Sequence, residues 1–142
     1  MIKQICIASD HAGFDLKEKI KSFLNEKNFE VIDFGTHSSE SMDYPDIAHP
    51  FAKAIDDGIY KIGIIMCGSG NGVSMVVNKY KKVRCALCWN KEIAEFARLH
   101  NDANVLSLPA RFITEKGALA IVDLFLNTEF EGGRHQKRVD KI

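Results

Sequence analysis

The sequence is poor in proline, has no surplus of charge of either sign and contains no long hydrophobic run. Its 142 residues include three prolines and ten glycines, and none of these lies in a low-complexity linker. Nineteen basic side chains balance nineteen acidic ones, so the formal net charge is zero. Proteins that bind nucleic acids or anionic membranes in general need an excess of positive charge. We therefore expect neither nucleic acid nor a membrane as a partner.

No apolar segment approaches the roughly 18 residues of a membrane-spanning helix, and the first residues lack the pattern of a signal peptide. The cytoplasm is the expected location. The four cysteines, Cys6, Cys67, Cys85 and Cys88, lie in apolar segments or beside glycines, which favours reduced thiols over a secreted disulfide framework. Cys85 and Cys88 are three apart on a predicted strand, so they point to opposite faces and do not predict a zinc site.

Short apolar segments alternate with longer stretches of helical periodicity along the chain. The apolar segments predict strands at 5–8, 31–34, 62–66, 83–88 and 105–108, and the other stretches predict helices near 16–24, 47–55, 72–80, 91–100 and 114–126. Strands that are apolar on both sides are typical of a parallel sheet covered on both faces. We predict a single domain over residues 1–142. Its expected α/β fold is a Rossmann-like doubly wound sandwich with a five-stranded parallel sheet and a C-terminal helical segment.

The loop after the third predicted strand reads Cys67-Gly68-Ser69-Gly70-Asn71-Gly72 and leads into a helix. Alternate glycines let backbone amides turn inward beside a helix start, which suits an anion. Val73 replaces the last glycine of a dinucleotide motif, and the lysine of a P-loop is missing. Glycine spacing alone favours a tight turn, but Cys67 adds a thiol whose thiolate these amides would stabilise. Cys67 is therefore a candidate nucleophile or general base.

Two further polar loops adjoin predicted strands. Asp10 and His11 follow the first strand, where they can bind sugar hydroxyls or a phosphate, although Asp10 can also cap the next helix. The loop His100-Asn101-Asp102-Ala103-Asn104 precedes the last strand. Its Asp and Asn residues are common turn formers. His100 differs, because an imidazole can transfer protons in both directions near neutral pH.

Basic residues gather near the C-terminus. Arg134 and Arg138 are four apart, so on a helix they share a face and can clamp a dianion. A solvated basic tail is the alternative. Arg111, after the fifth predicted strand, is a further candidate for the clamp.

Taken together, these motifs resemble the type B ribose-5-phosphate isomerases over nearly the whole chain. The segments that carry the resemblance are Ser9-Asp10-His11-Ala12-Gly13, Tyr44-Pro45-Asp46, the loop 67–72, the loop 100–104 and Gly133-Arg134-His135-Gln136-Lys137-Arg138. The wider family includes galactose-6-phosphate isomerase subunits and an allose-6-phosphate isomerase activity. The resemblance implies an aldose–ketose isomerase of D-ribose 5-phosphate and D-ribulose 5-phosphate that works through an enediolate and needs neither a metal nor another cofactor.

The resemblance also implies roles for single residues. It makes Cys67 the base that moves a proton between C1 and C2, with Ser69 shifting a proton between O1 and O2. It makes His100 the acid that opens the sugar ring, assisted by Asp10. The residues implied to bind the sugar or its phosphate are Asp10, His11, Tyr44, Gly68, Ser69, Gly70, Asn71, Gly72, Asn101, Arg111, Arg134 and Arg138.

The family's members form dimers or tetramers whose sites combine residues of two subunits, so we expect a homodimer or homotetramer. Two alternatives stay open at this point. A six-carbon sugar phosphate could be the substrate, because the same base and anion loop would serve it. The chain could also be a sugar-phosphate or nucleotide binding module on the same scaffold, although a binder has no need of Cys67 together with His100.

Overall fold

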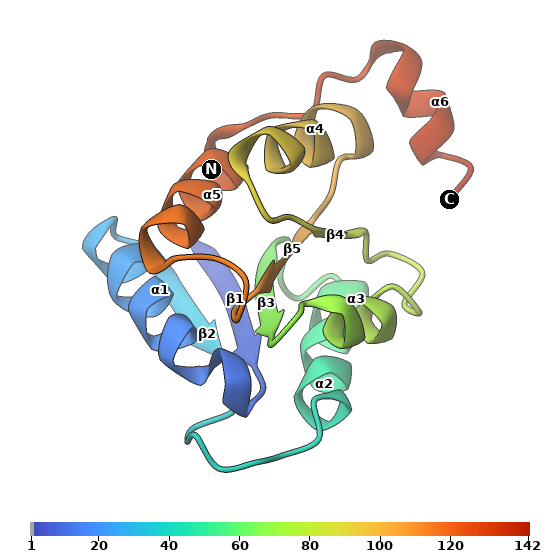
Figure 1. The fold of residues 1–142 in the computed structure, drawn as a ribbon. Helices are drawn as coiled ribbons and strands as arrows, with labels where there is room; N and C mark the ends of the chain where they lie inside the picture. Colours follow the sequence, from blue (N-terminus) through green and yellow to red (C-terminus); the bar gives the residue numbers. More distant parts are fainter. Residues whose placement is uncertain (1) are drawn as a thin grey trace.

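A five-stranded parallel sheet forms the centre of the computed structural model, which describes residues 2–142 (Figure 1). Its strands are β1 (Gln4–Ser9), β2 (Glu30–Asp33), β3 (Gly63–Cys67), β4 (Cys85–Leu87) and β5 (Val105–Pro109). They lie in the order β2-β1-β3-β5-β4, and every neighbouring pair is parallel. The predicted α/β fold with a five-stranded parallel sheet is therefore confirmed.

Helices cover both faces of the sheet. Figure 1 shows α1 (Phe14–Glu26), α4 (Lys91–Asn101) and α5 (Glu115–Asn127) on one face, with α2 (Pro45–Asp56) and α3 (Asn71–Val77) on the other. The 3-10 helix η1 (His11–Gly13) leads into α1. The chain ends with the 3-10 helix η2 (Gly133–His135) and the short helix α6 (Gln136–Val139), which extend beyond α4 at the upper right of Figure 1. Within residues 2–142, none of the helices combines the length and the apolar character that a membrane crossing requires.

Each strand contributes to two hydrophobic cores, because alternate side chains point to opposite faces. On β1, Ile5 and Ile7 pack in the core under α1, α4 and α5, whereas Cys6 and Ala8 pack in the core under α2 and α3. The central strands β1, β3 and β5 are almost fully buried. This double burial explains why the strands appear in the sequence as continuous apolar runs.

The main departure from the predicted elements is at β4. The sequence predicts a strand over 83–88, but the paired strand covers only Cys85–Leu87. Val83 instead closes a turn by donating its amide to the carbonyl of Tyr80 at 3.1 Å. Cys88 faces the core under α4 and α5, whereas Cys85 packs against the opposite core. The two thiols therefore point to opposite faces, as their spacing predicts.

A buried lysine joins α1 to the end of β2. The side chain of Lys17 is completely buried, and its Nζ lies 2.6 Å from Oδ2 of Asp33 and 3.1 Å from Oε2 of Glu18. Lys21 also donates to Asp33 Oδ2, at 2.7 Å, and the Gly35 amide donates to the other oxygen at 2.8 Å. Burial alone would raise the pKa of the Asp33 carboxyl, but these donors outweigh it and hold that pKa below its ordinary value.

We expect Asp33→Asn to lower the free energy of unfolding by about 3 kcal/mol, because it leaves the Lys17 ammonium group buried without its shortest partner. Urea unfolding monitored by circular dichroism measures this change. In the wild type, the contribution of Asp33 is complete above its unfolded pKa of about 3.9 and disappears as the pH falls through the lower folded value. The wild type should therefore lose more stability than the variant below about pH 4.

The matched control is Asp57→Asn. Asp57 pairs with Lys53 on the surface of α2 at 2.8 Å, and exposed pairs contribute little to stability. If Asp33→Asn and Asp57→Asn lowered the free energy of unfolding equally, the buried Lys17–Asp33 pair would have no special role in stability.

Candidate active site

The carboxyl ends of three central strands bring one group of predicted site residues together. The register pairs Ser9 with Met66 and Cys67 with Pro109, so β1, β3 and β5 end at the same edge of the sheet. At this edge, in the strand ends, loops and helix starts, lie Asp10, His11, Tyr44, Cys67, Gly68, Ser69, Gly70, Asn71, Gly72 and Arg111. Ligands of open parallel sheets bind at this edge. We refer to these ten residues as the carboxyl-edge group.

Cys67 is the last residue of β3, and its thiol lies under the loop that follows. It is 6% exposed, and the Gly70 amide donates a hydrogen bond to its Sγ at 3.2 Å. The Asn71 amide donates to the Ser69 hydroxyl at 3.3 Å. Within residues 2–142, the backbone amides of Gly68, Ser69 and Gly72 donate to no acceptor. The loop thus holds one amide against the sulfur. The three amides without an acceptor in residues 2–142 are suited to an oxyanion.

The conformation of this loop depends on Gly70. Its φ of +75° lies in the left-handed region, and a Cβ there would approach Cδ1 of Leu87 to 2.5 Å. The Gly70 carbonyl accepts hydrogen bonds from the hydroxyls of Ser74 at 2.6 Å and Ser107 at 2.9 Å. These two serines thus hold the carbonyl group of Gly70, the residue whose amide bonds the Cys67 sulfur. Sequence reasoning assigned neither serine to the site, although Ser107 is a polar residue within an apolar strand.

Side chains from two other segments stand beside the loop. Tyr44, which immediately precedes α2, lies against Gly72, where an added Cβ would be 2.5 Å from the ring carbon Cζ. Arg111 lies over Gly68, with Nη1 3.2 Å from the position of an added Cβ. The Arg111 amide also donates to the Gly68 carbonyl at 2.9 Å. The glycines therefore allow an aromatic ring and a guanidinium group to approach the loop closely.

Asp10 and His11 already have partners within the chain. Asp10 is buried, and its Oδ1 accepts a hydrogen bond from the Gly13 amide at 3.1 Å. It therefore caps η1, which is the structural role that the sequence also allows. The Met42 amide donates to Nδ1 of His11 at 3.2 Å. A neutral imidazole that accepts at Nδ1 carries its proton on Nε2. His11 thus has an N–H available for an anion.

A second group of predicted residues lies at the opposite edge of the sheet. His100 and Asn101 belong to the last turn of α4, not to a loop, and this turn precedes β5. Arg134 is in η2 and Arg138 in α6. We call these four residues the amino-edge group. The five residues of β5 separate the two edges by about 13 Å at a rise of 3.3 Å per residue. A single chain therefore does not bring His100 to Cys67.

Three residues of the amino-edge group line a pocket at this edge. This pocket has a volume of about 430 Å³ and is lined by His100, Asn101, His135, Arg138, Val139 and Ile142. Arg134 is exposed and is not among the lining residues. The spacing of the two arginines predicts a shared helical face, but the change from 3-10 to α-helix between them alters that geometry.

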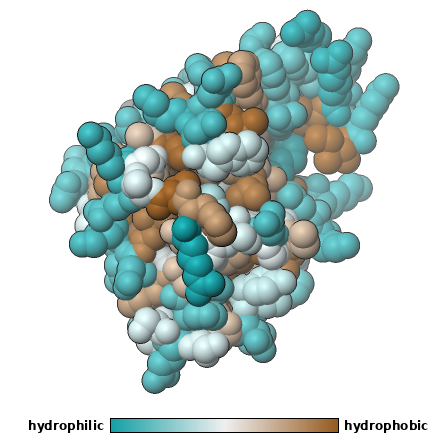
Figure 2. Space-filling model, viewed as in Figure 1, coloured by the Kyte–Doolittle hydropathy of each residue, from teal (hydrophilic) through white to brown (hydrophobic). Residues whose placement is uncertain are grey.

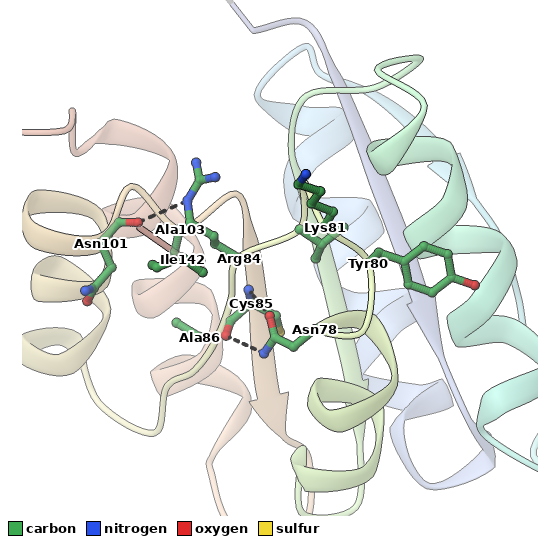
Figure 3. A pocket seen from close by; sticks show the side chains of 10 residues that line it. Asn78, Tyr80, Lys81, Arg84, Cys85, Ala86, Asn101, Ala103 and Ile142 are labelled. Carbon is green, nitrogen blue, oxygen red and sulfur yellow. Dashed lines mark hydrogen bonds between the residues drawn. The ribbon is translucent and has the colours of Figure 1, made fainter. Parts of the chain in front are cut away.

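Two arginines that sequence reasoning did not single out hold the end of α4. Figure 3 shows Arg84, whose Nε donates to the Asn101 carbonyl at 3.2 Å, beside a pocket of about 410 Å³ along the edge of β4. Arg84 also donates to the carbonyl of Asp102 at 2.8 Å, and Arg98 donates to that of Ala103 at 2.6 Å. Both also pair with the Asp102 carboxylate, Arg84 at 3.2 Å and Arg98 at 3.1 Å. The carbonyl groups that they bind are ones left without a partner by the end of the helix.

Comparisons with known proteins agree on one family. A family model described as Ribose/Galactose Isomerase matches residues 5–142. A Rickettsia bellii protein, named no more precisely than a sugar phosphate isomerase, is 45% identical over 97% of this chain and 96% of its own length. The crystal structure of a ribose 5-phosphate isomerase from Thermotoga maritima superposes with a TM-score of 0.94 at 49% identity, covering 97% of this chain and 95% of that one. The structure of ribose-5-phosphate isomerase B from Mycoplasma genitalium with bound ribulose-5-phosphate gives a TM-score of 0.94 at 45% identity, covering 97% and 92%.

Proposed function

This chain is a sugar phosphate isomerase of the Ribose/Galactose Isomerase family, and we propose that it interconverts D-ribose 5-phosphate and D-ribulose 5-phosphate. The observation that carries the proposal is the loop after β3, where a buried thiol accepts an amide hydrogen bond beside three amides without acceptors. The relative from Mycoplasma genitalium, whose structure holds ribulose-5-phosphate, supports a five-carbon substrate.

Proton transfer is assigned to Cys67. Its thiolate removes the proton from C2 of the open-chain aldose. The electron pair of the broken C2–H bond forms the C1–C2 double bond of an enediolate. The negative charge then develops on the sugar oxygens, where the free amides of Gly68, Ser69 and Gly72 can donate to it. Cys67 returns the proton to C1, and the Ser69 hydroxyl moves a proton between O1 and O2. No electron carrier is needed, because oxidation at C2 balances reduction at C1.

Ring opening is assigned to His100 with Asp10, and phosphate binding to residues of both edges. His11 contributes its Nε2 hydrogen and Arg111 its guanidinium group, while Arg134 and Arg138 complete the clamp. Asn101 contacts the sugar, and Tyr44 lines its pocket. Since Asp10 and His100 belong to different edges of one chain, this assignment requires the amino-edge group of one chain to meet the carboxyl-edge group of another.

We therefore propose a homodimer, alone or as half of a tetramer, in which each site is shared. Large apolar side chains available to a second copy support this. Phe112 is 75% exposed, Met75 66% and Trp89 56%, and exposed apolar area of this kind marks interaction surfaces. In the view of Figure 2, apolar residues reach the surface near the middle of the molecule and beside the C-terminal segment at the upper right.

The substrate assignment is tested by measuring kcat/KM side by side for ribose 5-phosphate, allose 6-phosphate and galactose 6-phosphate. We expect ribose 5-phosphate to be preferred by at least about tenfold, since one carbon more or less in a fitted pocket changes the transition-state free energy by about 1–3 kcal/mol. A preference for either hexose phosphate would overturn the pentose assignment but not the sugar phosphate isomerase activity. Activity on none of the three substrates would contradict both the pentose assignment and the isomerase activity.

A further inference from the structure

Three side chains that commonly ligate metals meet beside the end of α4. The imidazole rings of His100 and His135 are stacked, with centroids 4.1 Å apart and planes inclined by 14°. Glu131 faces both rings, with Oε2 3.9 Å from Nε2 of His100 and Oε1 3.9 Å from Nε2 of His135. One ligand atom from each residue lies within 4.8 Å of the other two.

The backbone holds this cluster together although its members are distant in sequence. The Glu131 amide donates to the carbonyl of Leu99 at 3.1 Å, which ties the segment after α5 to the last turn of α4. Gly132 and Gly133 then adopt φ values of +69° and +56°, and the chain turns back so that the His135 amide reaches the Gly132 carbonyl at 3.0 Å. Positive φ at two successive positions favours glycine. This turn stacks the imidazole ring of His135 on that of His100.

His135 has a ligand atom without a partner. The residue is 5% exposed, and its Nε2 is buried and makes no hydrogen bond within residues 2–142. A buried polar atom left unpaired costs free energy, and a ligand at Nε2 would remove that cost.

We propose that His100, Glu131 and His135 form a binding site for one divalent transition-metal ion of the zinc type. Two imidazoles and one carboxylate suit Zn²⁺, Ni²⁺ or Cu²⁺ better than Mg²⁺ or Ca²⁺, which prefer sets of oxygen ligands. The positive charge of Arg138 in the adjoining pocket repels any cation and so disfavours Mg²⁺ and Ca²⁺, which are held mainly by electrostatic attraction. Transition metals also form bonds to imidazole nitrogen, and these bonds compensate for the repulsion by Arg138.

Binding requires a modest rearrangement. Tetrahedral bonds of about 2.0–2.2 Å bring ligand atoms to about 3.3 Å from one another, so the stacked rings must splay toward the carboxylate. The Glu131 side chain is 55% exposed and free to approach them. The adjoining pocket of about 430 Å³, lined in part by His100 and His135, has room for a water molecule in the fourth position.

Metal binding would inhibit the isomerase. An ion on Nε2 of His100 occupies the lone pair that the imidazole needs to exchange protons during ring opening. Only this consequence rests on the proposed function, because formation of the metal site does not depend on the substrate. The ion acts as an inhibitor here and takes no part in the isomerisation.

Titration of the chelator-treated protein with Co²⁺ tests the site, followed by displacement with Zn²⁺. We expect about one Co²⁺ per chain with the visible absorption of a four-coordinate nitrogen and oxygen site. Loss of one ligand in Glu131→Gln or His135→Gln should weaken binding by at least about tenfold. The matched controls are Glu129→Gln, which removes an exposed carboxylate from the same loop, and His49→Gln, which removes an imidazole that bonds Tyr80 instead. Both controls should bind like the wild type.

Several results would overturn the proposal. These are no stoichiometric binding, equal affinity in all four variants, or a strong near-ultraviolet thiolate-to-metal band, which would place the ion on a cysteine. In the isomerase assay, Zn²⁺ should inhibit the wild type reversibly and inhibit Glu131→Gln far less. Tight binding without inhibition would refute the inhibitory role while leaving the metal site in place.

Discussion

The Cys67→Ala variant should fold normally and lose isomerase activity by about 1000-fold, the contribution of a positioned proton-transfer group. The change removes the sulfur that accepts the Gly70 amide at 3.2 Å and with it the base that transfers the C2 proton. The loss should appear in kcat, since the variant keeps His11 and Arg111, the residues that we propose to bind the phosphate. Steady-state kinetics and calorimetric binding of ribose 5-phosphate measure the two effects separately.

Cys88→Ala is the matched control. Burial raises the pKa of the Cys88 thiol to about 12, so this thiol stays protonated at neutral pH and cannot serve as a base. The pKa of Cys6 is raised to about 12 by burial in the same way. Cys88→Ala should change stability more than kcat. Near-full activity of Cys67→Ala would refute the assignment of the base.

Mixed oligomers of two inactive variants should recover activity. Cys67→Ala removes the proposed base at the carboxyl edge, and His100→Ala removes the proposed ring-opening acid at the amino edge. If each site combines the two edges from different chains, a dimer with one chain of each kind has one intact site and one site with both changes. Random re-association of equal amounts should then restore about a quarter of the wild-type activity. Activity measured after mild denaturation and refolding of the mixture tests this.

The reciprocal mixture sharpens the experiment. When the double variant Cys67→Ala/His100→Ala is mixed equally with the wild type, shared sites predict that activity falls to about a quarter, because mixed dimers have no intact site. A site contained within one chain predicts a fall to only about half. The first experiment can also refute the shared site. It does so if the mixture of Cys67→Ala and His100→Ala is no more active than either variant alone.

Much of the fold was predictable because the information is local. A strand buried on both faces must be apolar at successive positions, and a helix that packs on the sheet must be apolar at every third or fourth position. The limits of β4 were not predictable in this way, since its pairing with the distant strand β5 covers only Cys85–Leu87. Lys17 is polar by sequence yet fully buried, because Asp33, on a separate element, neutralises it.

For the site, the sequence sufficed wherever a motif is contiguous and follows a strand. The loop Cys67–Gly72 is one segment, so its thiol, amides and left-handed glycine necessarily stay together. Asp10 and Arg111 lie near this loop because each follows a parallel strand, and parallel strands end at the same edge. The supporting hydroxyl of Ser107, by contrast, was visible only once β5 had been placed beside β3.

The sequence by itself determined the order of strands and helices, the family resemblance and the Cys67 loop, since each depends on neighbours along the chain. Only the tertiary structure decided which edge of the sheet each polar segment occupies. His100 lies at the end of a helix that has crossed back along the sheet, so it is far from Cys67 in its own chain but stacked on His135. Contacts between α4 and the segment after α5 have no periodic signature. They arise from packing, which brought together the group His100, Glu131 and His135 that no motif predicts.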